Sequence, residues 1–183
     1  MKDLSEKKRA FFLDRDGTLN VHKGYIKRAE EIELCPGVTE AVRMINESGY
    51  LAVIISNQAV IARGEASFAE VDRMMERVET LVEEGGAHID DYFYCPHHPD
   101  RGFPGEVAEL KIECSCRKPQ PGLLYQAAEK YNIDLSKSYM IGDSFRDVGA
   151  GENAGCTAYL LDDHKGNDYD YKDLLECVKA VLA

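Results

Sequence analysis

The sequence predicts an α/β fold in which helices flank a parallel sheet. Short apolar runs alternate along the 183-residue chain with segments of helical periodicity, which is the order typical of a doubly wound sheet. Polar and acidic residues follow the ends of several of these apolar runs. Ligands of open α/β sheets bind at the carboxyl ends of the strands, so both observations indicate the same architecture.

The first half of the chain predicts two strands and two helices. Residues 10–13 are an apolar run that predicts a buried strand. Residues 38–47 have helical spacing between glycine-containing turns, and residues 51–56 form a second apolar run that predicts a strand. Residues 68–84 predict a helix because their apolar residues recur on one face, and Gly85 ends it.

The second half continues the alternation. Residues 89–94 predict a third strand, which a long loop follows. Residues 121–131 predict a helix whose first residue, a proline, suits an early helical position. Strands are expected at 139–143 and 157–161, and residues 171–182 predict a last amphipathic helix.

The composition is that of a globular domain, with 44% hydrophobic and 30% charged residues. The length suits one domain, and we expect it to span residues 1–183. A net charge of −11 disfavours nucleic acid and anionic membranes as partners. Residues 1–8 lack an apolar core, and no run approaches the roughly 20 apolar residues of a membrane span. We therefore expect a cytoplasmic protein without a signal peptide, and we expect it to be a monomer.

Two carboxylates follow the first predicted strand. Asp14 and Asp16 are separated by one residue and precede Gly17. Carboxylates at this spacing can share one divalent cation, and hard oxygen ligands suit Mg²⁺. The alternative is a strand followed by an acidic turn without a catalytic role. Polar residues at the other strand ends favour the metal site.

Further polar residues lie where they can converge on these carboxylates. Ser56 ends the second predicted strand, Lys118 precedes a predicted helix, and Asp143 ends the fourth predicted strand. The carboxyl ends of parallel strands meet at one edge of the sheet, so we expect these side chains to lie together. Asp147 lies four residues beyond Asp143. It either orients a metal-bound water or Lys118, or caps the next helix, and the sequence leaves both roles open.

A second constellation indicates a zinc site in the long loop. Its members are Cys95, His97, Cys114 and Cys116. Three thiols and an imidazole in two closely spaced pairs suit a closed tetrahedral Zn²⁺ shell, which leaves no position for substrate and so is structural. His98 is the rival imidazole, and the alternative to zinc is three incidental cysteines. We call residues 95–116 the Cys/His loop and expect zinc to staple it.

The ordered motifs resemble those of the haloacid dehalogenase (HAD) superfamily, most of whose members are phosphatases. The match runs through Asp14-Arg15-Asp16-Gly17-Thr18, then Ser56, Lys118 and Asp143. The resemblance implies a Rossmann-like HAD fold. It also implies that there is no cap domain, because the chain has no domain-sized insertion. The site would then be open and shaped by its loops.

The resemblance implies a role for each of these side chains. Asp14 would attack phosphorus and form an aspartyl-phosphate, and Asp16 would protonate the leaving oxygen and then activate water. Ser56 would donate a hydrogen bond to a phosphoryl oxygen, and Lys118 would neutralise the gathering negative charge. Asp143 would complete a Mg²⁺ site with Asp14 and the backbone carbonyl of Asp16.

Four segments are similar to the D-glycero-D-manno-heptose-1,7-bisphosphate 7-phosphatase family. They are residues 14–20, 57–64, 94–99 and 114–122. The resemblance implies a Mg²⁺-dependent enzyme with a structural Zn²⁺ that removes the C7 phosphate from a small phosphorylated sugar. The related histidinol-phosphate phosphatases share the nucleophile motif and a similar zinc loop. A phosphatase for histidinol phosphate or another small phosphomonoester stays open, as does a zinc-stapled binding module that has lost catalysis.

The same resemblance implies which residues contact the substrate. They are His22, Lys23, Gly24, Tyr25, Asn57, Gln58 and Arg117. Arg117 would approach the distal phosphate, and Arg63 would either serve the same phosphate or pair with an acidic surface neighbour. The chain departs from the family at Ala59 and Val60, where Ser-Gly is common, and at the His22-Lys23 pair. These departures lie in the recognition residues, so they bear on the substrate more than on the reaction.

Overall fold

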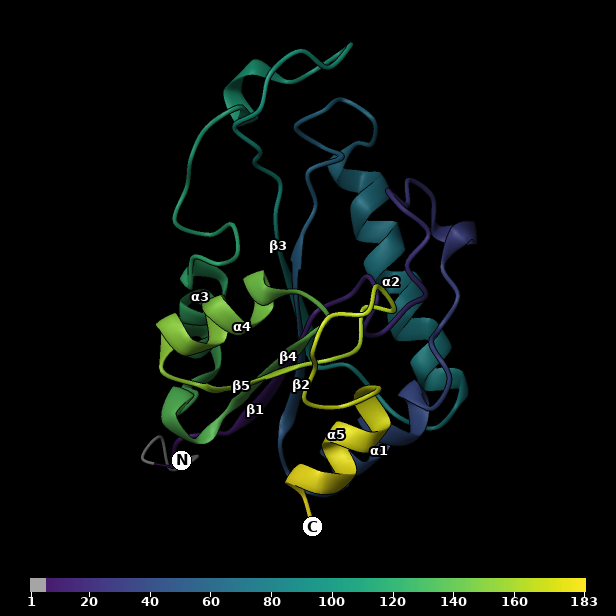
Figure 1. Cartoon of the computed structure of the whole chain (residues 1–183), viewed down its shortest axis with the longest axis vertical. Coiled ribbons are helices and arrows are strands. Elements are labelled where there is room, and N and C mark those ends of the chain that lie inside the picture. Colours follow the sequence, from purple (N-terminus) through teal and green to yellow (C-terminus); the bar gives the residue numbers. More distant parts are fainter. Residues whose placement is uncertain (1–5) are drawn as a thin grey trace, which may run out of the picture.

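The computed structural model describes residues 6–183. The expectation that the start lacks a signal peptide depends mostly on residues 1–5, which lie outside the described residues. Five strands form one parallel sheet in the order β3-β2-β1-β4-β5 (Figure 1). The strands are β1 (Ala10–Leu13), β2 (Leu51–Asn57), β3 (Asp91–Cys95), β4 (Tyr139–Gly142) and β5 (Thr157–Leu160). The predicted fold class and all the predicted strands are confirmed, with β3 beginning two residues later than expected.

The strand order reverses at β1. The chain adds β2 and β3 on one side of β1 and then crosses to add β4 and β5 on the other side. In the register of the sheet, Phe11 lies opposite Ala52 of β2 and Tyr139 of β4. Such a reversal leaves a crevice at the carboxyl end of the central strand. The two carboxylates that follow β1 therefore enter this crevice.

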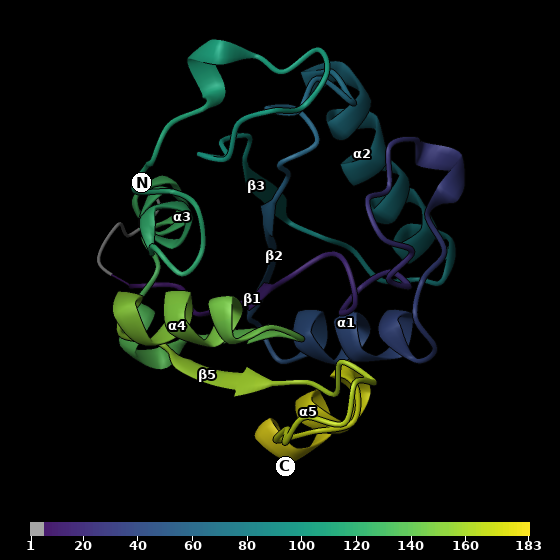
Figure 2. The ribbon, with the colours of Figure 1, turned by 45° about the horizontal axis from the view of Figure 1, so that its top comes forward.

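Helices cover both faces of the sheet (Figure 2). One face packs against α1 (Val38–Glu47), α2 (Phe68–Glu84) and α5 (Leu174–Val181), and the other against α3 (Gly122–Tyr131) and α4 (Phe145–Ala154). The short 3₁₀ helices are η1 (Ala29–Glu31), η2 (Ala108–Leu110) and η3 (Leu135–Lys137). The predicted helices are present. The last one begins at Leu174 and not at residue 171, because Asp173 caps it by accepting a hydrogen bond from the Glu176 amide at 2.8 Å.

The β1 side chains alternate between two apolar layers. Phe11 and Leu13 enter the layer under α1, α2 and α5, whereas Ala10 and Phe12 enter the layer under α3 and α4. All of them are fully buried. A parallel strand covered on both faces needs apolar residues at every position, which explains why the strands appear in the sequence as unbroken apolar runs.

Two loops at the carboxyl end of the sheet pack against each other. The Cys/His loop rises from β3, and the segment 58–67 rises from β2 beside it (Figure 1). The Val107 amide donates to the Ala62 carbonyl at 2.9 Å. Gly64 has a φ of +71°, and a Cβ there would lie 1.8 Å from the Gly105 carbonyl oxygen, so only glycine permits this approach. Within residues 6–183, no helix is long and apolar enough to cross a membrane.

Candidate active site

Lys118 lies buried between two aspartates at the carboxyl end of the sheet. Its Nζ is 2.7 Å from Asp14 Oδ1 and 2.5 Å from Asp147 Oδ1. It also donates to the Ile55 carbonyl at 2.8 Å. Burial alone lowers the pKa of Lys118, but the two carboxylates outweigh burial and raise its pKa above the ordinary value. Lys118 is therefore a fixed cation in contact with Asp14.

Asp147 fills both of the roles that the sequence left open. Its Oδ2 accepts a hydrogen bond from the Ser144 amide at 3.0 Å, which completes a capping box at the start of α4. Its Oδ1 meanwhile binds Lys118. A Cβ at Gly142 would lie 2.2 Å from Asp147 Oδ2, so the preceding strand must end in glycine for this arrangement to form.

Three carboxylates converge beside Lys118. Asp14, Asp143 and Asp147 each offer an oxygen within 4.8 Å of the others. Burial and the nearby Asp147 raise the pKa of Asp14 to about 7, against the lowering effect of Lys118. Burial likewise raises the pKa of Asp143 to about 6, with a further contribution from Asp14. A divalent cation would relieve this repulsion, and a set of oxygen donors fits Mg²⁺.

Asp16 lies outside this cluster because other donors hold its carboxylate. Arg15 Nη2 is 2.9 Å from both carboxylate oxygens, and Arg15 Nε is 3.2 Å from Oδ1. Asn20 donates to Oδ1 at 3.1 Å, and Gln58 donates to Oδ2 at 3.4 Å. The Asp16 side chain is 23% exposed and lines the pocket.

The amide side chains after β2 bind other site residues. Gln58 Nε2 donates to Ser56 Oγ at 2.8 Å, and both residues are buried. Because Ser56 Oγ accepts this bond, its own proton stays available for another acceptor. Asn57 Oδ1 accepts from the Lys118 amide at 3.0 Å, and Asn57 Nδ2 donates to the Lys118 carbonyl at 3.2 Å. Asn57 thus fixes the backbone that carries Lys118.

A cavity of about 350 Å³ opens over these groups. Arg63, Arg117 and Arg146 also line it. Within residues 6–183, none of these three guanidinium groups forms a salt bridge with a carboxylate. Burial lowers the pKa of Arg117, and the charges of Arg146 and Arg63 lower it further. The cavity therefore joins a carboxylate cluster to a region of unpaired positive charge.

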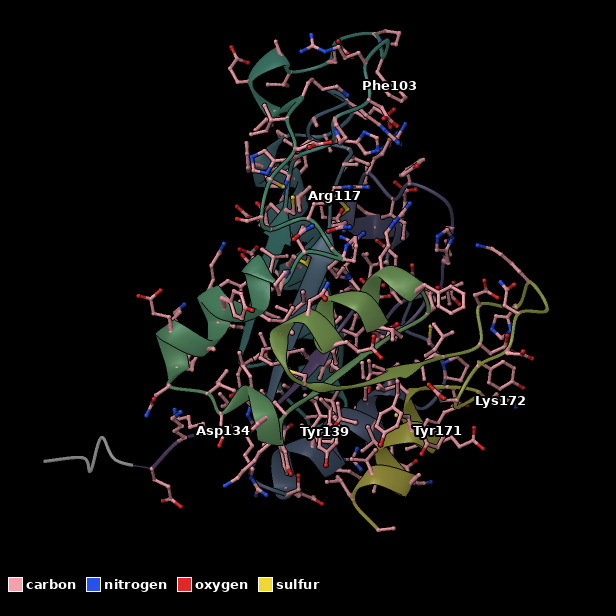
Figure 3. The ribbon with its side chains drawn as sticks, turned by 60° about the vertical axis from the view of Figure 1, so that its left-hand side comes forward. Phe103, Arg117, Asp134, Tyr139, Tyr171 and Lys172 are labelled. Atoms are coloured by element: carbon pink, nitrogen blue, oxygen red, sulfur yellow. The ribbon has the colours of Figure 1, made fainter. Side chains whose placement is uncertain are left out.

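Arg63 is held by aromatic rings and not by an acid. Its guanidinium carbon lies 4.2 Å from the centre of the Tyr25 ring and 4.6 Å from that of Phe103. The residue is 8% exposed, and its Nε has no hydrogen-bond partner. Figure 3 shows Phe103 near the tip of the Cys/His loop and Arg117 closer to the sheet. Among residues 6–183 no carboxylate pairs with Arg63, which goes against the alternative of an acidic surface partner.

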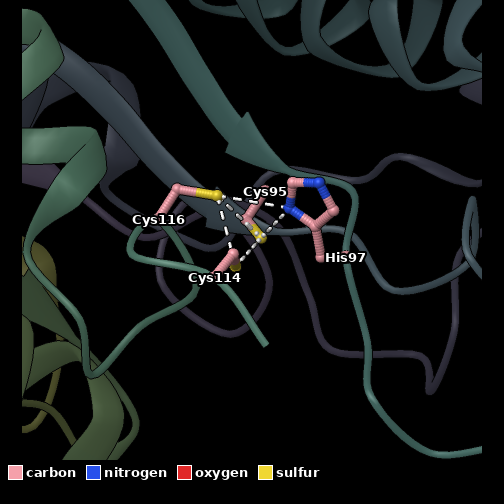
Figure 4. Close-up of side chains that lie close together, drawn as sticks. All are labelled: Cys95, His97, Cys114 and Cys116. Carbon is pink, nitrogen blue, oxygen red and sulfur yellow. Dashed lines mark hydrogen bonds between the residues drawn. The ribbon is translucent and has the colours of Figure 1, made fainter. Parts of the chain in front are cut away.

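The four predicted zinc ligands lie together (Figure 4). The Sγ atom of Cys95 is 3.5 Å from that of Cys114 and 3.2 Å from that of Cys116. His97 Nδ1 lies 3.4 Å from the sulfurs of Cys95 and Cys116. Tetrahedral Zn²⁺ with Zn–S bonds of about 2.3 Å places sulfur atoms about 3.8 Å apart, so the cluster has close to the right size. His98 is not part of it, because its Nδ1 accepts from the Asp100 amide at 3.1 Å.

The comparisons with known proteins agree with this geometry. A family model described as HAD-hydrolase-like matches residues 115–178. The D-glycero-beta-D-manno-heptose-1,7-bisphosphate 7-phosphatase of Yersinia pestis is 40% identical over 152 residues, which cover 83% of this chain and 79% of the relative. The protein of the same name from Escherichia coli K12 is 39% identical and is covered to 78%. The chain belongs to this heptose-bisphosphate phosphatase family.

A solved structure of the heptose-bisphosphate phosphatase family has the same fold. The D,D-heptose 1,7-bisphosphate phosphatase of B. bronchiseptica superposes with a TM-score of 0.80 at 28% identity, covering 95% of this chain and 98% of that one. That crystal structure contains magnesium and phosphate. A HAD-like phosphatase from Mesorhizobium loti superposes with a TM-score of 0.82 at 30% identity. The chain is therefore a phosphatase of the HAD superfamily, as its sequence motifs predicted.

The structure gathers most of the residues that the sequence predicted for a heptose-bisphosphate phosphatase. The cavity is lined by Asp14, Asp16, His22, Gly24, Tyr25, Asn57, Gln58, Arg117, Lys118 and Asp143. Lys23 is not among them, since its Nζ lies 2.8 Å from Glu33 Oε2 and points to that exposed pair. The departures Ala59 and Val60 are buried residues in the wall of the same cavity.

Two arginines of the site were not predicted. They are Arg15, which is fully buried and binds Asp16, and Arg146, and both line the cavity. An arginine is usually exposed, so nothing in the pattern of residues 14–16 indicates that one is buried. The position of Arg146 on the first turn of α4 was a usable signal, because that turn begins at the carboxyl end of β4.

Proposed function

We propose that the protein is a Mg²⁺-dependent phosphatase that removes the C7 phosphate of D-glycero-D-manno-heptose 1,7-bisphosphate. The observation that carries this proposal is the cavity, which joins the Asp14–Lys118 pair to arginines that have no carboxylate partner among the described residues. A bisphosphate has one phosphoryl group for each end of such a cavity. The names of the relatives and the magnesium in the B. bronchiseptica structure support the same assignment.

In the proposed mechanism Asp14 is the nucleophile. Its carboxylate oxygen bonds to phosphorus while the bond from phosphorus to the C7 oxygen breaks, and Asp16 gives its proton to the leaving oxygen. Asp16 then takes a proton from water, which attacks the aspartyl-phosphate and releases inorganic phosphate and free Asp14. Lys118, in contact with Asp14, offsets negative charge in both steps, and Ser56 Oγ donates to a phosphoryl oxygen.

Two metals have residues suited to them in this proposal. Asp14, Asp143 and the backbone carbonyl of Asp16 would hold Mg²⁺, which supplies positive charge against the phosphoryl oxygens. The Cys95, His97, Cys114 and Cys116 cluster would hold Zn²⁺. Its four protein ligands close the shell, so this zinc is structural.

The arginines of the cavity are suited to bind the second phosphate of the substrate. A guanidinium group binds a phosphate through paired donors, and Arg117 and Arg63 would do so for the phosphate that is not cleaved. Histidinol phosphate offers a cationic amine at that end instead of an anion, so the unpaired arginines disfavour it. We therefore place the protein with the heptose enzymes and not with the histidinol-phosphate phosphatases.

We also propose that residues 1–183 act as one domain and as a monomer in the cytoplasm. A net charge of −11 supports a small-molecule substrate over nucleic acid or an anionic membrane.

A phosphate-release assay with Mg²⁺ tests the proposed function. The substrates are the heptose bisphosphate, fructose 1,6-bisphosphate and histidinol phosphate at equal concentrations. We expect the highest kcat/KM for the heptose bisphosphate and loss of turnover when a chelator removes Mg²⁺. A higher kcat/KM for histidinol phosphate would assign the protein to the other family, and no release from any ester would indicate a binding module.

A further inference from the structure

Arg15 is a buried charge at the centre of the nucleophile motif. It is fully buried, and its side chain lies against α2, where Nη1 is 3.9 Å from Met74 Sδ. Its salt-bridge partner is Asp16. Burial of a guanidinium group is costly unless a carboxylate pairs with it, and an apolar side chain would fill the same space without that cost. Packing against α2 therefore does not explain the charge.

The contact between Arg15 and Asp16 fixes the orientation of the carboxylate. Arg15 presents two nitrogens to Asp16, which defines the plane of the carboxylate as well as its position. The Arg15 carbonyl accepts the amides of Leu19 at 2.9 Å and Asn20 at 3.0 Å, so the turn after β1 holds Arg15 itself in place. Arg15 is therefore anchored at both its backbone and its guanidinium group.

Asp16 also belongs to a chain of hydrogen bonds that ends at Ser56. Gln58 Nε2 lies 3.4 Å from Asp16 Oδ2 and 2.8 Å from Ser56 Oγ. This arrangement keeps the Asp16 carboxylate on the cavity wall, outside the cluster formed by Asp14 and Asp143. A carboxylate that joined that cluster would be a metal ligand and would be unavailable for proton transfer.

We infer that Arg15 is a positioning residue that keeps Asp16 at the cavity wall for proton transfer and out of the metal cluster. This inference rests on the proposed role of Asp16 as general acid and base. Arg15 lines the cavity, but its guanidinium is paired with Asp16, so it acts through that carboxylate. Its effect is therefore confined to the step in which the leaving oxygen needs a proton, and to the later activation of water.

Esters with different leaving groups test this inference. An alkyl phosphate such as the heptose bisphosphate needs a proton on its leaving oxygen, whereas p-nitrophenolate leaves p-nitrophenyl phosphate without one. Arg15→Lys keeps a positive charge but loses the paired nitrogen donors, and Arg15→Met removes the charge from a side chain of similar length. Both should lower kcat/KM, which covers only the steps up to release of the leaving group, at least about tenfold more for the alkyl ester than for the aryl ester, because general acid catalysis contributes on the order of 10²-fold or more. The activation of water is common to both esters and does not enter this ratio.

Two controls make the result specific to Asp16. Arg43 donates to the Gly85 carbonyl on the far surface, so Arg43→Lys should leave the ratio of alkyl to aryl rates unchanged. In an Asp16→Asn background, Arg15→Lys should add no further change in that ratio. Loss of both activities in Asp14→Asn tests the proposed reaction separately from Arg15. Equal losses of kcat/KM for both esters in a folded Arg15→Lys protein would overturn the inference and assign Arg15 a structural role. Failure of both Arg15 variants to fold would do the same.

Discussion

Asp14 has neighbours of both charges, which act on it in opposite directions. Lys118 binds it at 2.7 Å and stabilises its negative charge, while Asp143 and Asp147 crowd it with like charge. An uncleaved phosphate ester brings further negative charge into this space. Lys118 and the proposed Mg²⁺ would together offset this charge, so we expect substitution of Asp14 to affect catalysis and stability differently.

We predict that Asp14→Asn abolishes turnover without unfolding the protein. The amide has nearly the same shape but is a poor nucleophile, and loss of a nucleophile costs more than about 10³-fold in kcat. Without Mg²⁺ the variant should melt at the same temperature as the wild type or higher, because one crowded carboxylate is gone. Phosphate release and Tm with and without Mg²⁺ provide the check. Sustained turnover by the pure variant would refute Asp14 as the nucleophile.

Substitution of Asn57 can distinguish a role in positioning Lys118 from a contact with the sugar. Both ends of its amide bind the Lys118 backbone, so Asn57→Ala should displace Lys118 and lower kcat about ten- to hundredfold with little change in KM. Asn46 is a matched control, since it holds the His88 backbone by the same two bonds on the outer surface. Asn46→Ala should leave kcat unchanged. A rise in KM for the heptose bisphosphate at constant kcat would instead support the substrate contact that the sequence predicted for Asn57.

Among the secondary-structure elements, the ends of the strands were predictable from the sequence and one helix, α4, was not. Unbroken apolar runs mark β1 and β2 because both faces of the sheet are covered, and Asp14 and Ser56 follow from their positions at the ends of those strands. The sequence reading did not define α4, because Gly149 and Gly151 interrupt its apolar pattern. A Cβ at Gly151 would lie 2.6 Å from the Met140 Cβ, so the glycine allows α4 to approach β4. Close packing of this kind weakens the very periodicity by which helices are recognised.

The Cys/His loop joins the four predicted zinc ligands to Lys118 through a short stretch of chain. Cys116 lies two residues before Lys118, and the Arg117 amide donates to Cys114 Sγ at 3.3 Å. We predict that Cys114→Ser lowers zinc content and kcat together while the sheet stays folded, because a loosened loop misplaces Arg117 and Lys118. Elemental analysis, circular dichroism and the phosphate assay measure the three effects. Cys156→Ala, outside the cluster, should retain zinc. Full activity in a zinc-free Cys114→Ser protein would show that the loop needs no metal.

In the whole molecule, two loops far apart in sequence pack together beside the cavity, and the segment 58–67 lines it. Phe103 of the Cys/His loop lies against Arg63 of the segment 58–67, and Gly64 permits the contact between the loops. No local pattern reveals this pairing, which explains why the sequence left the role of Arg63 open. Arg63, Arg117 and Arg146 thus line one cavity of a protein whose net charge is −11.

We predict that Gly64→Ala raises KM for a bisphosphate and lowers stability. A Cβ there meets the Gly105 carbonyl, so the loops must separate and Arg63 must move with them. Gly49 is the matched control, because it has a similar φ of +78° with open space around it. Gly49→Ala should cost only the left-handed strain of about 1–2 kcal/mol and leave KM unchanged. Equal Tm and KM values for the two variants would contradict the proposed link between loop packing and substrate binding.

The proposed function requires the enzyme to cleave one phosphate of a bisphosphate and to leave the other on the sugar. Phosphorus-31 NMR of the reaction with D-glycero-D-manno-heptose 1,7-bisphosphate tests it most directly, since the anomeric and C7 phosphates give separate signals. We expect the C7 signal to disappear, one equivalent of inorganic phosphate to form and the anomeric phosphate to persist. Loss of the anomeric phosphate first, or release of both phosphates at similar rates, would contradict the proposed function.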